Sequence, residues 1–307
     1  MESGGLEHAD IAVIGGGPAG LQAALVTSRA GKQVVVFDDP APSRNAASHG
    51  VHNFLGLDGL LPGEIREIAW KQIGEYENAV LVKMRVADVS RDEAGQFVIT
   101  GADDSKLLAT KVLLSLGYHD VHPAVPGFAE CWADTIINCP FCDGYENRDR
   151  VWGIVPSSQG QLSRFPMMAR NWTSEIEVLL PSGMEIESEY RQELSVLGIT
   201  CHEGTVVEVH HSNGKVESVR LDSGERVEVG TLLWLPEAKP SPLIARIAEN
   251  LGLALDEDGW VETDESQKTN VDGLWAAGEV ETSCSSAILS AAAGSMAASA
   301  IVRSWYS

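Results

Sequence analysis

Basic residues and long apolar runs are scarce in this chain. Its 307 residues include 22 Lys and Arg against 44 Asp and Glu, a formal net charge of −22. A surface of that sign repels the phosphates of nucleic acids and of anionic lipids, so we expect neither nucleic acid nor a membrane as a partner. No apolar run is long enough to span a bilayer, and residues 1–10 show no basic region of a signal peptide.

Cysteine is scarce as well, and this excludes a secreted disulfide scaffold. The five cysteines are an odd number with one close pair, which fits a reducing compartment and predicts a cytoplasmic protein. In that pair, Cys139-Pro-Phe-Cys142, two intervening residues allow a small disulfide that opens and closes readily. Asp143, directly after it, can supply or remove the proton that thiol chemistry needs.

Zinc is the competing interpretation of this pair. It needs two more ligands at suitable spacing, and the remaining cysteines form no second pair. His119 and His122 have no cysteine partner nearby, and the eight histidines show no catalytic spacing. The sequence therefore predicts a redox-active disulfide, with Cys139, Cys142 and Asp143 as catalytic residues and no metal.

A glycine fingerprint follows the first apolar stretch. Residues 11–14 are typical of a short strand, which leads into Gly15, Gly17, Pro18, Ala19 and Gly20 and then into an Ala- and Leu-rich helix. Such glycines let helix N–H groups approach a pyrophosphate. Residues 34–37 indicate the next strand, and Asp38 follows it where an acid can bond a ribose hydroxyl. This context predicts an FAD site.

The remaining pattern predicts two units of dinucleotide-binding type. Residues 63–77 indicate a helix, and 81–113 indicate a small antiparallel meander. A second strand–turn–helix unit begins at Val151, followed by strands at 177–180, 204–209, 216–221 and 227–234. We predict an α/β fold of two Rossmann-like domains, the second inserted into the first. Residues 1–118 and 238–307 form the FAD-binding domain, and 119–237 form the inserted domain with the cysteine pair.

In combination and order, these motifs resemble the low-molecular-weight thioredoxin reductase family over nearly the whole chain. The resemblance also rests on Asn53, Gly117, the block Gly273-Leu-Trp-Ala-Ala-Gly278, and residues 294–298. It implies a non-covalent FAD, a homodimer, and a thioredoxin-like protein or small dithiol as partner. It further implies that Cys142 faces the flavin while Cys139 exchanges with the external thiol.

The resemblance also implies cofactor contacts. Asp38 corresponds to a ribose ligand and Asn53 to a position near the flavin, whereas Arg44 and Asn45 are either pyrophosphate or ribose contacts or an ordinary loop. Glu279 stands where the family has Asp near the ribityl or pyrophosphate region. A helix over 285–304 would aim its N-terminal dipole at the flavin. The implied cofactor-binding set includes Gly117, Gly278, Glu279, Ser286 and Ala287.

Two departures from the family bear on NADPH. The second fingerprint reads Val155-Pro-Ser-Ser-Gln-Gly-Gln-Leu162, and residues 181–187 carry two acids where the family has arginines. Both disfavour NADPH, and the chain looks more like diflavin-linked relatives than ferredoxin-linked ones. A second flavin, or side chains such as Trp152, Phe165 and Trp172, would fill the vacated pocket. The alternatives are an NADPH-dependent reductase with a degenerate motif, an oxygen-dependent dithiol oxidase and a flavin-bearing redox sensor.

Overall fold

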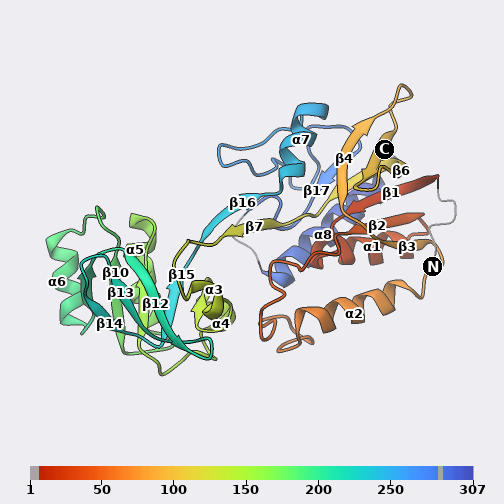
Figure 1. Cartoon of the computed structure of the whole chain (residues 1–307). Helices are drawn as coiled ribbons and strands as arrows, with labels where there is room; N and C mark the ends of the chain where they lie inside the picture. The colour runs from red at the N-terminus through yellow and green to blue at the C-terminus, as the bar shows by residue number, and fades with distance from the viewer. Residues whose placement is uncertain (1–6, 283–285, 307) are drawn as a thin grey trace. The chain divides into compact units, whose positions relative to one another are not determined.

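The computed structural model describes residues 7–282 and 286–306, and the contacts divide them into two units (Figure 1). Unit 1 draws on 1–46, 60–119 and 238–307, and unit 2 on 47–59 and 120–237. The short segment 47–59 therefore groups with unit 2, although it leaves and rejoins unit 1 in sequence. The chain passes between the units again at residues 119–120 and 237–238, within β7 (Tyr118–Val121) and β16 (Glu237–Pro240), and these two strands pair with each other.

Unit 1 is built on one mixed sheet with the order β3-β2-β1-β6-β5-β4, and β17 pairs with β6. The first three strands are continuous apolar runs paired in parallel, as expected where both faces are covered. The antiparallel edge confirms the predicted meander only for β4, β5 and β6, since β3 pairs in parallel with β2. The strands are β1 (His8–Ile14), β2 (Val34–Asp38), β3 (Ala79–Lys83), β4 (Val86–Arg91), β5 (Phe97–Gly101), β6 (Lys106–Leu114) and β17 (Leu274–Ala276).

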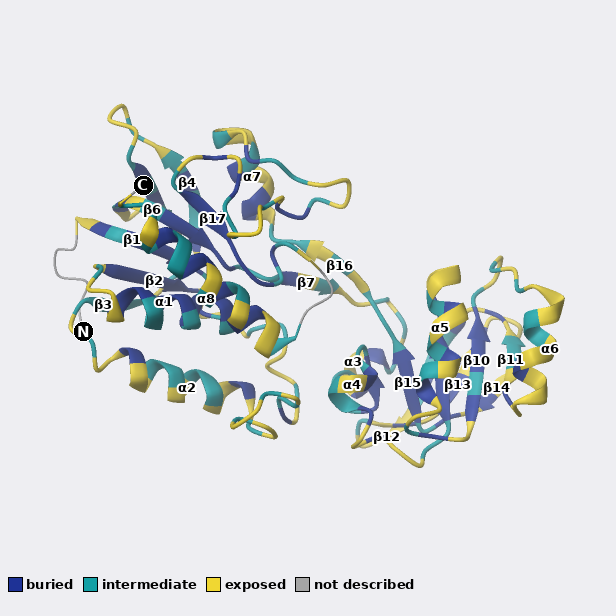
Figure 2. Ribbon diagram, turned by 180° about the vertical axis from the view of Figure 1, so that it is seen from behind, coloured by how far each residue is buried: buried dark blue, intermediate teal, exposed yellow. Residues whose placement is uncertain are grey.

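Helices cover both faces of this sheet. Three lie on one side in Figure 1, where α1 (Pro18–Arg29) packs closely on α8 (Ala287–Arg303) and more loosely on α2 (Pro62–Ile73). The close approach depends on Gly294, since a Cβ there would strike the backbone of Ala19. On the other side, α7 (Pro242–Leu251) packs against β4. Figure 2 shows the central strands buried between these layers.

Unit 2 is a second, smaller Rossmann-like layer structure. Its parallel sheet has the order β11-β10-β9-β15-β8, and an antiparallel sheet β12-β13-β14 packs on it through apolar side chains. The strands are β8 (Ile136–Ile137), β9 (Trp152–Val155), β10 (Ile176–Leu180), β11 (Thr200–Glu203), β12 (Val206–Ser212), β13 (Lys215–Leu221), β14 (Arg226–Glu228) and β15 (Thr231–Trp234). The helices are α3 (Phe128–Cys131), α4 (Pro140–Asp143), α5 (Gln159–Ala169) and α6 (Ser188–Val196).

The fold class is confirmed, but two strand predictions in unit 2 are wrong in detail. The strand predicted at 204–209 lies at Val206–Ser212, and the preceding Thr200–Glu203 form a separate strand of the parallel sheet. Residues 227–234 form two strands in different sheets, because the chain leaves β14 at Val229 and Gly230 to join the parallel sheet as β15. The N–H of Gly230 donates to the carbonyl of Val151 at this crossing. Because apolar residues continue from one strand into the next, the sequence pattern of residues 227–234 looks like that of one continuous strand.

Two features with functional meaning are not found in the described part of the chain. No helix among residues 7–282 and 286–306 has the length and apolar character to cross a bilayer. The same residues hold no group of three His, Cys, Asp or Glu side chains suited to a metal ion.

Candidate functional site

The turn between β1 and α1 in unit 1 has the geometry of a pyrophosphate cradle. Gly17 is the N-cap of α1, no side chain caps it, and a Cβ built there would meet nothing within 4 Å. The next residue is Pro18, which has no N–H, so the first free amides of the helix belong to Ala19 and Gly20. Open space before a helix N-terminus with unbonded amides suits an anionic group, so these residues fit the pyrophosphate of FAD.

Asp38 lies beside this turn, at the carboxyl end of β2. It is buried, and a Cβ at Gly16 would come within 2.6 Å of its carboxyl carbon. A carboxylate so close to the glycine turn stands where a ribose hydroxyl would be bound. Sequence reasoning missed Arg66 of α2, which pairs with the Asp38 carboxylate.

A second group of predicted residues meets at the end of β6 in unit 1. The Arg44 guanidinium stacks over the ring of Tyr118 at 4.1 Å, and its Nη1 lies 3.8 Å from Oε1 of Glu279. Gly117 has a positive φ of 67°, and a Cβ there would lie 3.9 Å from Oε2 of Glu279. Residues from three distant parts of the sequence thus form one polar cluster, which Asn45, in an exposed turn, does not join.

The last predicted cofactor residues lie where α8 begins. Gly278 has a φ of 86°, and a Cβ there would approach the Cβ of Ala19 to 2.9 Å, so glycine allows the chain to pass against α1. Ser286 caps α8, its side chain accepting the N–H of Leu289, and Ala287 is the first helical residue. The predicted start at Ser285, and Cys284 before it, lie outside the described residues.

The cysteine pair lies on α4 in unit 2 and is closed as a disulfide. Cys139 is the N-cap of this four-residue helix, Cys142 is its third residue, and their Cα atoms are 5.3 Å apart. Both cysteines are half-buried, whereas Phe141 between them is exposed. The half-buried pair agrees with a disulfide that an external thiol can reach.

Asp143 ends α4 and has an unusual electrostatic environment. Burial raises the pKa of its carboxyl from 3.8 to about 6, and the neighbouring Glu146 carboxylate adds to the rise. His52 and His49 act in the opposite direction. A carboxyl that titrates near neutrality can both accept and donate a proton under physiological conditions.

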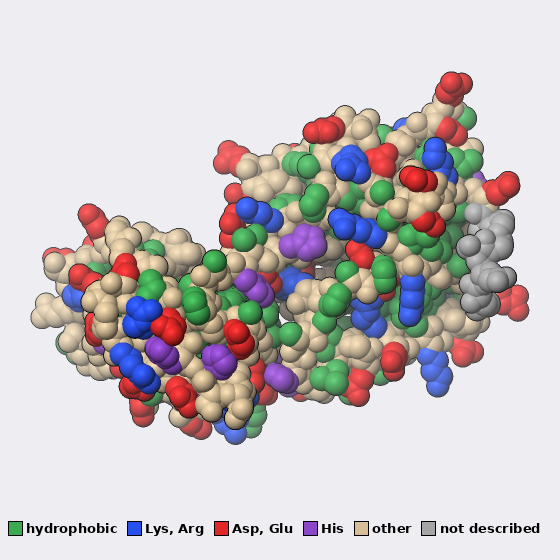
Figure 3. Space-filling model, viewed as in Figure 1, with side chains coloured by type: hydrophobic (Ala, Val, Ile, Leu, Met, Phe, Trp, Pro, Cys, Tyr) green, Lys and Arg blue, Asp and Glu red, His purple; other side chains and the backbone are tan. Residues whose placement is uncertain are grey.

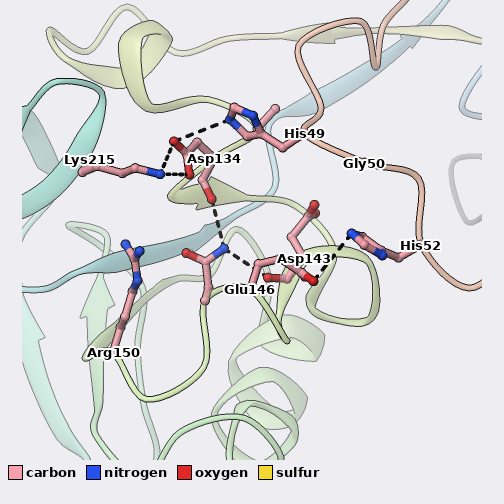
Figure 4. A pocket seen from close by; sticks show the side chains of 10 residues that line it. His49, Gly50, His52, Asp134, Asp143, Glu146, Arg150 and Lys215 are labelled. Atoms are coloured by element: carbon pink, nitrogen blue, oxygen red, sulfur yellow. Dashed lines mark hydrogen bonds and ion pairs between the residues drawn. The ribbon is translucent and has the colours of Figure 1, made fainter. Parts of the chain in front are cut away.

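Residues 47–59 place further side chains beside this disulfide, within unit 2. The Asn53 side-chain amide donates to the carbonyl oxygen of Phe141 at 2.7 Å, which ties this segment to α4. His52 and His49 line a cavity with Asp143 and Glu146 (Figure 4). Sequence reasoning missed both histidines, because no local sequence pattern shows that residues 47–59 pack against α4, which lies about 90 residues later in the chain.

The second strand–turn–helix, from β9 to α5, differs from the first in how its amides are used. The Ser158 side chain accepts the N–H of Gln161 at 3.2 Å, and the Gln161 side-chain oxygen accepts the N–H of Ser157 at 2.9 Å. Gln159 donates to the carbonyl of Glu185 at 2.8 Å, which joins the turn to the acidic loop after β10. In unit 2, backbone N–H groups that could bind a phosphate instead donate to side chains of the same turn.

These structural features agree with the comparisons to known proteins. The family model described as "Pyridine nucleotide-disulphide oxidoreductase" matches residues 9–151 and 175–298.

The chain belongs to this family.

Its relatives narrow the assignment. Thioredoxin reductase aclD of Aspergillus oryzae is 28% identical over 303 residues, 95% of either protein. Thioredoxin reductase tcpT of Claviceps purpurea is 30% identical over 88% of this chain and 86% of its own. The crystal structure of a putative thioredoxin reductase TrxB from Bacillus anthracis has a TM-score of 0.89 and 30% identity, covering 97% of this chain and 98% of that one. The chain is a thioredoxin reductase-like flavoprotein oxidoreductase, and FAD is typical of its family.

Proposed function

We propose that this protein is an FAD-dependent dithiol–disulfide oxidoreductase that does not use NADPH. The observation that carries the proposal is the contrast between its two strand–turn–helix motifs. Gly17 leaves the helix amides of unit 1 open, whereas Ser158 and Gln161 occupy the corresponding donors of unit 2. A pyrophosphate would have to displace these internal hydrogen bonds, each worth about 1 kcal/mol, before it gained any contact.

Charge near the turn supports the same conclusion. The loop 181–187 carries Glu185 and Glu187, and the carbonyl of Glu185 is bonded to Gln159 at the start of α5. Because this backbone bond holds the acidic loop against the start of α5, we expect its carboxylates to disfavour the phosphates of NADPH. The family match also leaves out residues 152–174, which contain β9, the turn and α5.

The chemistry at the disulfide follows from the residues around it. A substrate thiolate attacks Cys139, a mixed disulfide forms, and Cys142 leaves as a thiolate. The second substrate thiol then attacks the mixed disulfide and releases Cys139, so that the substrate leaves as a disulfide and the enzyme keeps two thiols. Asp143 takes up a thiol proton during this exchange. Bound FAD supplies a two-electron acceptor for the reduced pair.

An oxygen-dependent dithiol oxidase is the second candidate function, in which Asp143 would have the same role. With a pKa of about 6 this carboxyl is mostly ionised at pH 7, and it is then ready to accept protons from an incoming dithiol. Molecular oxygen would take the two electrons and two protons and leave as hydrogen peroxide. A small dithiol or a thioredoxin-like protein is the thiol partner in either case, because thioredoxin reductases are among the relatives. A homodimer is part of the same proposal.

Aromatic side chains form part of the apolar core of unit 2. Trp152 is fully buried and stacks on Trp172, with ring centres 6.0 Å apart and an interplanar angle of 8°. Phe165 packs against the same apolar cluster. One FAD per chain, held in unit 1, is part of the same proposal.

Anaerobic flavin bleaching tests the proposal directly. The FAD-loaded protein is titrated separately with dithiothreitol, NADPH and NADH while the flavin absorbance is followed. We expect stoichiometric bleaching by dithiothreitol and none by micromolar NADPH or NADH. Rapid bleaching by NADPH would restore the ordinary reductase function.

Two controls make this test specific. The variant Cys142→Ser should lose bleaching by dithiothreitol, because the electrons enter through the cysteine pair. Hydrogen peroxide formed in air during dithiothreitol oxidation separates the oxidase from an enzyme that needs another acceptor. If Cys142→Ser is bleached as fast as the wild type, the disulfide is not on the electron path.

A further inference from the structure

A charged cavity of about 230 Å³ lies beside Asp143 in unit 2 (Figure 4). Its walls come from segment 47–59, from the stretch around α4, and from Lys215 of β13. The Lys215 ammonium is bonded to both oxygens of Asp134, so that side of the cavity is internally neutralised. Nε2 of His49 also lies on that side, 3.5 Å from Oδ2 of Asp134, whereas His52 lies against Glu146 in the same cavity as Asp143 (Figure 4).

The imidazole of His52 is held in place by glycine backbone. A Cβ at Gly50 would lie 3.1 Å from Nε2 of His52 and one at Gly59 would lie 3.9 Å from its Cε1, so the ring lies against both positions. Its side chain is 26% exposed, whereas that of His49 is 73% exposed. Of the two histidines, only His52 is fixed by close packing.

Two carboxylates orient this ring. Oδ1 of Asp58 accepts the N–H of Asn53 at 2.7 Å, while Oδ2 lies 3.7 Å from Nδ1 of His52. On the other side of the ring, Nε2 lies 3.6 Å from Oε1 of Glu146. Asn53, with a φ of 62°, also bonds the carbonyl of Phe141, so the ring is tied to the helix that carries the disulfide.

We propose that His52 is a positioning residue for Asp143: the positive charge of its protonated ring favours the ionised carboxylate, which takes up the proton of the substrate thiol. This inference rests on the proposed function, because it concerns exchange at the same disulfide. The substrate S–H proton goes to the Asp143 carboxylate as sulfur attacks Cys139. It then leaves Asp143 for solvent, while His52 keeps its own proton, and this proton transfer changes no oxidation state.

The electrostatics agree with the geometry. His52 lowers the pKa of Asp143 more than His49 does, whereas burial and Glu146 raise it. The other charged groups around the cavity are Asp58, Asp134, Arg150 and Lys215. Removing a positive charge from His52 must raise the pKa of Asp143 further, which leaves less carboxylate available as a base at pH 7.

The test compares His52→Gln with the matched variant His49→Gln in the FAD-loaded protein. The titration of Asp143 is read from its carboxyl ¹³C resonance, which Asp143→Asn assigns. We expect His52→Gln to raise this pKa by about 0.5 unit or more. His49→Gln should change it by less, because an exposed charge is screened by solvent.

Kinetics provide the second measurement. The rate of anaerobic flavin reduction by dithiothreitol, followed from pH 5 to pH 9, should fall roughly threefold at pH 5 in His52→Gln and converge on wild type above pH 7, where Asp143 is ionised in both proteins. Asp58→Asn retains an acceptor for the Asn53 N–H, removes the charge at Nδ1 and should give an intermediate shift. It serves as the second variant if His52→Gln does not fold.

The outcomes separate this inference from the proposed function. If dithiothreitol fails to bleach the wild-type flavin, the proposed function fails, while the titration of Asp143 still decides the role of His52. If dithiothreitol bleaches it and the Asp143 resonance titrates identically in wild type and His52→Gln, His52 has no such role. A uniform loss of rate at every pH, with an unmoved titration, would indicate a structural effect and also overturn it.

Discussion

The substitution Asp143→Asn should stabilise the protein while it impairs thiol exchange. Inside the fold the pKa of Asp143 is about 6, against an ordinary 3.8, and burial is the main cause. Between these two values the folded protein binds more protons than the unfolded chain, so stability falls as pH rises. A rise of roughly two units corresponds to about 3 kcal/mol, lost completely once the pH exceeds the folded pKa.

Urea unfolding at several pH values measures this effect. At pH 7.5 Asp143→Asn should be more stable than wild type by up to about 3 kcal/mol, and the gain should vanish below pH 4, where the carboxyl is protonated in both states. Asp149→Asn is the matched control, because the side chain of Asp149 is 87% exposed; it should change stability by less than about 0.5 kcal/mol. A gain that persists at pH 4, or no gain at pH 7.5, would refute the reasoning.

Three further predictions concern the flavin. Gly17→Val should place a side chain in the open space before α1 and abolish FAD binding. Its control is Gly63→Val, at an exposed glycine of α2 with equally open surroundings, which should bind FAD normally. Equal loss of FAD in both variants would indicate misfolding. Cys139→Ser should give a broad long-wavelength absorbance band from the remaining Cys142 thiolate, and Cys142→Ser should lack it; a band in the second variant alone would reverse the two roles. With excess FAD, the flavin-to-protein ratio should saturate near one, and a value near two would show a second flavin.

The fold was largely predictable because its signals are local. Buried parallel strands such as residues 34–38 are continuous apolar runs, and a glycine turn before a helix marks the first motif. The division of residues 227–234 was not predictable, since Val227 and Val229 are buried exactly as a single strand would require. Only the pairing partners, which lie far away in sequence, distinguish two strands from one.

The site was predictable where a residue's neighbours in sequence are also its neighbours in space. Cys142 and Asp143 lie in one short helix that Cys139 caps, so their spacing in sequence was enough to predict that they lie together. His52 and Arg66 were missed, because each meets its partner only after the chain has folded back over a long distance. Polar contacts between residues far apart in sequence leave no periodic pattern from which they could be predicted.

Carboxylates are spread over the visible face of both units, with Lys and Arg interspersed (Figure 3). Such a surface offers an acidic electron carrier no strong attraction. Together with the internally bonded turn before α5, this is consistent with the thiol route that we propose for the electrons. A thiol route requires a proton acceptor at the disulfide. Under the proposed function Asp143 is that acceptor, although burial makes its ionised form destabilise the fold, and the proposed role of His52 is to favour this ionised form from the same cavity.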